Sequence, residues 1–254
     1  MSKNDRELLS KGGLRLDGRR PNELRRIRCK LGVFSAPDGS AYIEQGLTKV
    51  LAAVYGPHDV KGGRSKALHD SAVINCQFSM AVFSTTDRKK RPRGDRKSTE
   101  LSMHLQQALE AAIKSELYPF CQIDIYVEVL HADGGIYPAC VNAATLALVD
   151  AGIPLKEYVC ACTASLANND VPMVDISHHE EIMGGPTLTV AALPMSGKIV
   201  LMEMSQRFHL DHLEKVLNKA LQGCKDIKQI LDAAVRLHVR EIGSSTGWAS
   251  TSIS

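Results

Sequence analysis

The sequence lacks both the long apolar runs and the strong excess of one charge that assign many proteins to a class at once. No stretch approaches the roughly 20 apolar residues of a membrane-spanning helix, and MSKNDRELLSKGG has no apolar region typical of a secretory signal. We therefore expect a soluble intracellular protein with no membrane partner. Lys and Arg number 31 against 28 Asp and Glu, and this net charge of +3 is too weak to imply nucleic-acid binding by itself.

Several motifs of catalysis and metal binding are also missing. The chain has no G-x-S-x-G, no Walker A loop and no H-E-x-x-H. Its 7 cysteines are an odd number, and most lie in apolar runs, where a free thiol behaves as a small hydrophobe. Cys160 and Cys162 are the only close pair, with no further ligands nearby. We expect buried free thiols in a reducing compartment, and we predict no metal site and no cofactor.

The remaining composition is that of a globular protein that folds on its own core. The 254 residues are 44% apolar and 23% charged, close to average usage. Strands are predicted at 27–34, 40–46, 48–56, 71–83 and 122–130, in VCACTASLA and VPMVDIS, and at 188–194 and 198–204. Helices are predicted from near Ser98 to Pro119, at 138–152, and from Leu210 to Ile242. The order predicts an α+β fold with a mobile arm at 1–13, one domain at 14–242 and a frayed tail at 243–254.

The strongest local signal is the basic segment DRKKRPRGDRK at 87–97. Its seven cations against two carboxylates are typical of a loop that contacts the phosphates of a nucleic acid. A nuclear-localisation patch and a solvated loop are the alternatives. Because no aromatic run lies nearby, we expect contacts to the backbone rather than a platform on which bases stack.

Two further segments have weaker signals. The glycine turn DGGIYP at 133–138 precedes a helix and could hold an anion, but it offers Ile136 and Tyr137 where an anion site would want a cation. A structural turn is the alternative. The segment Asp175–Glu181 contains His178, His179 and two adjacent carboxylates, which could bind metal or move protons. Because adjacent side chains diverge, a polar connection between strands is the alternative there.

Four long motifs resemble the ribonuclease PH family: LRLDGRRPNELR, DGSAYIEQGLTKVLAAVYGP, QIDIYVEVLHADGG and PACVNAATLALVDAGIP. The similarity extends from about Leu14 to Ile242. It implies a fold of mixed β-sheets packed with α-helices, and active members cleave RNA from its 3′ end with inorganic phosphate. Four segments resemble the eukaryotic exosome branch of that family more specifically: GVFSAPDGSAYIEQG, VYGPHDVKGGRSKAL, RPRGDRKS and VCACTAS.

That branch implies the protein's partners and location. Six ribonuclease PH-like subunits, paired through sheet edges and helices, form a ring that is capped by three RNA-binding subunits. RNA is threaded through the channel toward a separate hydrolytic nuclease, for rRNA maturation and mRNA turnover. We therefore expect RNA and these exosome subunits as partners, and a location in nucleus, nucleolus and cytoplasm.

The resemblance also implies that the catalytic site is a remnant. Active relatives read D-[AG]-G-[ST]-R at the glycine turn, and Tyr137 stands where the Arg holds phosphate. They also have two Asp residues six apart, where this chain has Glu181 and Thr187. We predict a subunit without catalytic activity. The alternatives are an active phosphate-dependent 3′-to-5′ exoribonuclease and a small-ligand or metal enzyme that reuses the site around His178, His179 and Glu181.

The RNA-contacting positions of the family keep their charge. The channel-lining Arg near the start of the first helix maps to Arg96 and Lys97, and the loop that narrows the channel maps to 59–68. The predicted RNA-binding residues are Lys61, Arg64, Lys66, Arg91, Arg93, Arg96 and Lys97.

Overall fold

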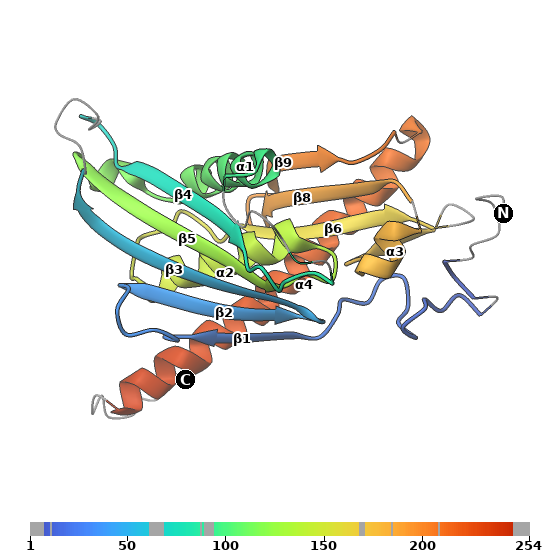
Figure 1. Cartoon of the computed structure of the whole chain (residues 1–254), viewed down its shortest axis with the longest axis horizontal. Helices are drawn as coiled ribbons and strands as arrows, with labels where there is room; N and C mark the ends of the chain where they lie inside the picture. The colour runs from blue at the N-terminus through green and yellow to red at the C-terminus, as the bar shows by residue number, and fades with distance from the viewer. Residues whose placement is uncertain are drawn as a thin grey trace.

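Two β-sheets form the frame of the molecule in the computed structural model (Figure 1), which describes residues 8–10, 12–60, 69–86, 88, 94–167, 171–183, 185–207 and 209–245. The first sheet has the order β1-β2-β3-β5-β4, with β1 (Ile27–Leu31), β2 (Gly39–Gln45), β3 (Thr48–Asp59), β4 (Val73–Met80) and β5 (Cys121–His131). The second has the order β7-β6-β8-β9, with β6 (Cys160–Leu166), β7 (Pro172–Val174), β8 (Thr187–Leu193) and β9 (Lys198–Met204). Their mixed and antiparallel pairing against helices confirms the α+β prediction.

One parallel pair sets the topology of the first sheet. β1, β2, β3 and β5 pair antiparallel, whereas β4 lies parallel to β5. Parallel neighbours need a crossover connection, and this one is made by α1 (Arg96–Ala112) and a short 3₁₀ helix, η3 (Ser115–Leu117). α1 packs against β4 and also against β9, which are edge strands of different sheets. The start of α1 is thereby held where the two sheets meet.

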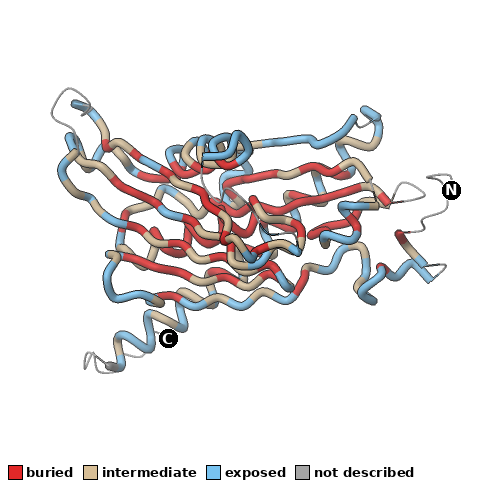
Figure 2. The backbone as a smooth tube through the Cα atoms, in the orientation of Figure 1, coloured by how far each residue is buried: buried red, intermediate tan, exposed pale blue. Residues whose placement is uncertain are grey.

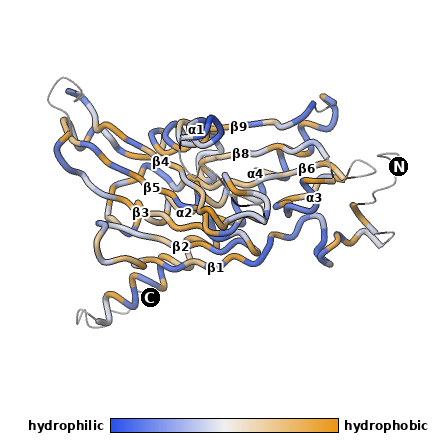
Figure 3. Tube along the Cα trace, viewed as in Figure 1, coloured by the Kyte–Doolittle hydropathy of each residue, from blue (hydrophilic) through white to orange (hydrophobic). Residues whose placement is uncertain are grey.

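Helix α2 (Ile136–Asp150) joins the two sheets through the core. It packs against β2 and β3 on one side and against β6 on the other. Nearly all of its side chains are buried, as expected for a helix that is apolar on every face. Figure 3 shows the apolar residues concentrated along α2 and the strands around it. Gly39 lets β2 approach this helix, because a Cβ at that position would lie 2.3 Å from the carbonyl oxygen of Ala147.

Helix α4 (Leu210–Ser245) runs along the second sheet and past β1. Its buried side chains recur every three or four residues, as expected for an amphipathic helix: Val216, Ala220, Cys224, Ile227 and Leu231. Beyond Leu231 the helix is increasingly exposed, as Figure 2 shows. No helix among the described residues is long and apolar enough to cross a membrane.

The first predicted helix is shorter than the sequence suggested. It begins two residues before Ser98 and ends at Ala112 rather than at Pro119. The chain leaves the helix because Ile113 adopts an extended conformation and forms an isolated bridge with Leu155. Leu117, which was predicted on the apolar face, is 60% exposed.

The polar segment connects two strands, β7 and β8, as one of the alternatives predicted, and it contains a short helix, α3 (His178–Ile182). Ser177 and Glu180 form a capping box, in which each side chain accepts a hydrogen bond from the backbone N–H of the other residue. The spacing Ser-x-x-Glu is a sequence signal for such a helix start, so this element was readable from the sequence.

The domain boundaries remain a prediction. Two observations concern the segments outside the predicted domain. Within the arm predicted to be mobile, Leu8 is buried against Ala167 and Met173. Within the tail predicted to be frayed, residues 243–245 still belong to α4. Residues 1–7, 11 and 246–254 lie outside the described part of the chain.

All seven cysteines are free. Five are buried, as the sequence predicted: Cys76, Cys140, Cys160, Cys162 and Cys224. Cys29 and Cys121 are half-buried. Burial raises the pKa of the Cys29 thiol to about 11 and that of Cys224 to about 12, so both thiols stay protonated at neutral pH.

Candidate functional site

The three positions predicted as catalytic remnants line one cavity of about 380 Å³. Tyr137 comes from the start of α2, Glu181 from α3 and Thr187 from the start of β8. Lys97, in the first turn of α1, lines the same cavity. The other lining residues are Met80, Thr85, Glu100, Leu101, Gly135, Ile136, Pro138, Thr163, Ile176, Thr189 and Glu203. We call this space the remnant cavity.

Tyr137 is fixed in the wall of the remnant cavity as a neutral side chain. It is buried, and its hydroxyl donates to the backbone oxygen of His104 at 3.2 Å. The two rings meet edge to face, with centroids 6.2 Å apart. Burial raises the pKa of the Tyr137 phenol, so the group carries no charge at any physiological pH. It offers nothing that could replace an arginine beside a phosphate.

The glycine turn before α2 depends on its two glycines. Gly134 and Gly135 have φ angles of +75° and +58°, in the left-handed region. A Cβ on Gly134 would lie 2.7 Å from backbone atoms of Ser177 and His178. The turn therefore lies directly against the start of α3, which brings Glu181 to the remnant cavity.

Thr187 is hydrogen-bonded to Ser205, which directly follows β9. Its hydroxyl and that of Ser205 are 2.5 Å apart, and its backbone N–H donates to the same Ser205 oxygen at 3.2 Å. A threonine so placed supplies no negative charge and has its hydroxyl already engaged.

The charge of the remnant cavity is opposite to what a phosphate site needs. Among the described residues that line it, Lys97 is a cation, and Glu100, Glu181 and Glu203 are carboxylates. Formal charges therefore sum to −2 around a space that a phosphate would have to enter. The hydroxyl of Thr163, a residue that is 94% buried in the wall, has no hydrogen-bond partner among the described residues.

Two buried ion pairs hold the wall that contains Glu181. Arg15 donates to Glu180 through Nε at 2.8 Å and Nη2 at 2.5 Å. Burial alone would raise the pKa of the Glu180 carboxyl, but hydrogen bonds from Arg15 and Ser177 outweigh it and lower the pKa. Because Glu180 is fixed inward, the adjacent Glu181 points outward to the remnant cavity.

The second pair joins Arg25 to Asp175. Asp175 is 1% exposed with a φ of +55°, and its carboxylate accepts from Nε and Nη2 of Arg25 at 3.0 and 2.8 Å and from Gln45 at 2.8 Å. Burial would raise the pKa of Asp175, but the charge and hydrogen bonds of Arg25 lower it. Arg25 also donates to the carbonyl oxygens of Asp133 and Gly134, so it ties the glycine turn to the strand that precedes α3.

These four residues are the part of the site that sequence reasoning missed. No role was assigned to Arg15 or Arg25 from the sequence, and Asp175 and Glu180 were considered only as members of the polar segment 175–181. The partners are separated by 150 and 165 residues, so no local spacing could pair them.

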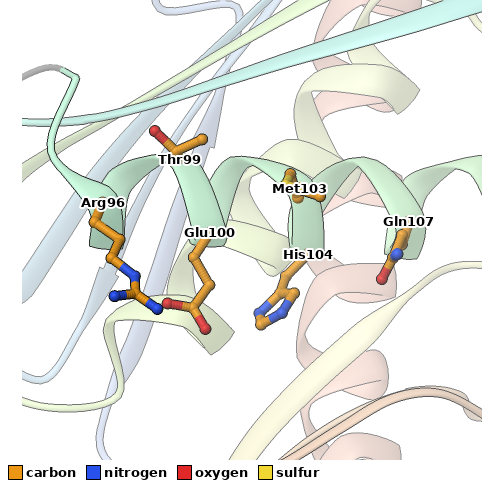
Figure 4. A pocket seen from close by; sticks show the side chains of 6 residues that line it. All are labelled: Arg96, Thr99, Glu100, Met103, His104 and Gln107. Carbon is orange, nitrogen blue, oxygen red and sulfur yellow. The ribbon is translucent and has the colours of Figure 1, made fainter.

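Of the seven predicted RNA-binding residues, the structure describes Arg96 and Lys97. Both are exposed in the first turn of α1, whose N-terminus is capped by the carboxylate of Asp95, which accepts from the N–H of Arg96 at 2.8 Å. Arg96 lines a groove of about 430 Å³ along the outer face of α1, where Glu100 and His104 project from the same side of the helix (Figure 4). Five predicted positions lie outside the described residues: Lys61, Arg64, Lys66, Arg91 and Arg93.

The histidine cluster is not gathered around one space. Glu181 lines the remnant cavity, whereas His179 lines a separate hollow with Arg19 and Arg25. Among the described residues, no group of three or more His, Cys, Asp or Glu side chains is arranged to hold a metal ion.

Comparison with protein families identifies the fold. A model described as the 3′ exoribonuclease family, domain 1, matches residues 23–154, which contain the first sheet, α1 and α2. Its domain 2 model matches residues 157–223, which contain the second sheet and the start of α4. The chain belongs to the 3′ exoribonuclease family. This membership confirms the resemblance to ribonuclease PH noted from the motifs.

Relatives within the family cover almost the whole chain. The human exosome complex component RRP41 is 58% identical over 92% of this chain and 96% of its own length. The RRP41 homologue of Arabidopsis thaliana is 44% identical over 93% of this chain and 97% of its own length.

Solved structures share the fold at lower identity. Rice Rrp46 matches with a TM-score of 0.76 and 24% identity over 86% of this chain and 98% of its own. A chain of the Archaeoglobus fulgidus exosome with RNA bound to the active site matches with a TM-score of 0.74 and 20% identity, over 86% of this chain and 93% of its own.

Proposed function

We propose that this chain is a non-catalytic ring subunit of the RNA exosome that helps to form the RNA-threading channel for 3′-to-5′ RNA processing and decay. Support comes from relatives of 44–58% identity and nearly equal length that carry the name exosome complex component RRP41, which is exosome component 4. Its partners are then RNA, the other ribonuclease PH-like ring subunits, the RNA-binding cap subunits and the hydrolytic exosome nuclease. The corresponding locations are nucleus, nucleolus and cytoplasm.

The charge of the remnant cavity carries the non-catalytic part of the proposal. Phosphorolysis needs fixed cations around the attacking phosphate and the phosphate of the bond that breaks, because positioning and charge stabilisation supply most of the rate. Here three carboxylates face one lysine, the arginine position is a neutral buried tyrosine, and Thr187 replaces an aspartate. A cavity of net charge −2 repels both inorganic phosphate and an RNA 3′ end.

The exposed cations at the start of α1 carry the RNA-guiding part. Arg96 and Lys97 are exposed, and Lys97 lies at the rim of the remnant cavity. Charged side chains that contact phosphates bind RNA without sequence preference and with a strong dependence on salt. Such contacts suit a channel through which many different RNAs pass.

The decisive experiment is an RNA-degradation assay on the ring reconstituted with this subunit, with and without inorganic phosphate, and without any hydrolytic nuclease. We expect no release of nucleoside diphosphates, together with RNA binding that weakens as salt rises. Phosphate-dependent trimming that disappears in the Glu181→Gln ring would overturn the proposal, because this chain would then be an active phosphorolytic exoribonuclease. Trimming that survives Glu181→Gln would locate the activity in another subunit.

A further inference from the structure

Phe83 is the most exposed aromatic side chain among the residues that the structure describes. It is 73% exposed, against 47% for Phe34 and Phe120. Leaving a large apolar side chain in water forgoes the free energy that its burial would supply. The first question is therefore whether the chain around Phe83 is fixed.

The turn that presents Phe83 is tied down on both sides. The N–H of Ala81 donates to Val129 on β5 at 2.9 Å, and the N–H of Ser84 donates back to Ala81 at 3.0 Å. The carbonyl oxygen of Ser84 accepts from Ala132 at 2.9 Å, and Ser84 is fully buried. Phe83 lies between these anchors, so its exposure is set by the fold and does not arise from a loose loop.

The ring borders a hollow of about 430 Å³ that is lined by Val82, Phe83, Thr85, Thr86 and Arg88. This volume lies within the range of small-molecule sites, about 300–1,000 Å³. The lining combines an aromatic face, two threonines and one guanidinium. Thr85 also lines the remnant cavity, so the hollow opens beside the space that Lys97 faces.

We propose that Phe83 stacks on a base of single-stranded RNA while Arg88 contacts a neighbouring phosphate. The inference rests on the proposed function and adds to it, because the sequence analysis predicted contacts to the RNA backbone only. Aromatic rings bind every base through its π-face, so the contact is tolerant of sequence. RNA is favoured over a protein partner because the hollow adjoins the cavity lined by Lys97, and because Arg88 lies beside the ring, where a phosphate next to the stacked base would need a cation.

Abasic RNA separates stacking from backbone contact. The reconstituted ring is titrated with single-stranded RNAs of equal length, each with one abasic nucleotide at a different position. We expect one position at which loss of the base weakens binding about 5- to 150-fold. In the Phe83→Ala ring this position dependence disappears, and Phe83→Trp restores it. Phe120→Ala, which removes an exposed ring at the opposite end of the β4–β5 pair, leaves the position dependence intact.

Each other outcome contradicts the inference. If Phe83→Ala preserves the abasic profile, no base stacks on Phe83. If Phe83→Ala and the milder Phe83→Leu both block ring assembly while the isolated chain keeps its circular dichroism spectrum, the side chain belongs to a subunit contact. Failure of the proposed function is distinguishable, because the wild-type ring would then show no salt-dependent RNA binding with any RNA.

Discussion

Removing the charge of Asp175 tests how the wall of the remnant cavity is held. Asp175 is 1% exposed, and its oxygens accept four hydrogen bonds, three from Arg25 and one from Gln45, at 2.8–3.0 Å. Asn is the right replacement, because it keeps the shape and tolerates the left-handed backbone, here with a φ of +55°. Asp175→Asn therefore removes the charge without adding backbone strain.

The loss of stability in Asp175→Asn follows from the buried charge of Arg25 that remains. The Arg25 side chain is only 6% exposed, so its guanidinium would stay buried without its carboxylate. Breaking a buried ion pair by removing one partner costs about 3–5 kcal/mol, a large part of the roughly 5–15 kcal/mol of a typical domain. With an m-value of about 2–3 kcal/mol/M, the urea midpoint falls by about 1–2.5 M. Urea unfolding of the full chain, followed by far-ultraviolet circular dichroism, measures it.

The pH dependence gives a second readout with a definite sign. Arg25 lowers the pKa of folded Asp175, so folding is stabilised by this carboxylate at pH values above its unfolded pKa of about 3.9. That stabilisation is lost as the pH falls through the lower folded pKa. The difference in unfolding free energy between wild type and Asp175→Asn is therefore constant near neutral pH and narrows below about pH 4.

An exposed ion pair supplies the matched control. Asp232 lies 3.3 Å from Lys228 on α4, where both side chains are partly exposed. Asp232→Asn should cost no more than about 0.5 kcal/mol. If Asp175→Asn shifts the midpoint no further than this control, or if the difference from wild type persists unchanged down to pH 2, the buried pair does not hold the wall.

Two further predictions test the RNA path and the glycine turn. The double variant Arg96→Glu, Lys97→Glu should weaken RNA binding by the ring and reduce the slope of log K against log salt by about 0.7 per lost phosphate contact. Lys225→Glu, which changes an exposed lysine on α4, is the control. An unchanged slope in the double variant would contradict the assignment of Arg96 and Lys97 to RNA. Gly197→Ala should lose about 1–2 kcal/mol of stability from its left-handed backbone alone, since nothing lies within 4 Å of the added Cβ. Gly134→Ala should lose clearly more, because its Cβ would lie 2.7 Å from backbone atoms; equal unfolding midpoints for the two variants would refute the close packing of the turn.

The sequence predicted best where one local pattern decides the structure. The segment 198–204 is a short, mainly apolar run that follows a Ser-Gly turn, and β9 has these bounds. A helix was predicted at 138–152, and α2 spans Ile136–Asp150. The resemblance to ribonuclease PH identified Tyr137, Glu181 and Thr187. Tyr137 lies more than 40 residues before the other two in the sequence, yet all three line one cavity in the structure.

Prediction failed where the interacting partners are distant in the sequence. Arg25 and Asp175 are 150 residues apart, and nothing in either segment identifies the other. Because no aromatic run lies near the basic segment at 87–97, contacts to the RNA backbone were predicted, without considering the single ring of Phe83 four residues before it. Its meaning depends on exposure, which hydrogen bonds to β5 and to Ala132 determine.

In the proposed non-catalytic subunit, the buried ion pairs keep the shape of the site independent of its chemistry. Arg15 and Arg25 bind Glu180 and Asp175 inside the wall, and neither pair includes a side chain predicted to have met phosphate in an active relative. A change at Tyr137 or at Thr187 therefore leaves α3 and the glycine turn in place, since their positions depend on ion pairs behind the cavity surface. Helix α1, whose first turn carries the exposed cations Arg96 and Lys97, is itself fixed by packing against β4 and β9. The positions predicted to be catalytic remnants and the cations predicted to guide RNA are thus held by separate contacts, so the proposed loss of the first leaves the second in place.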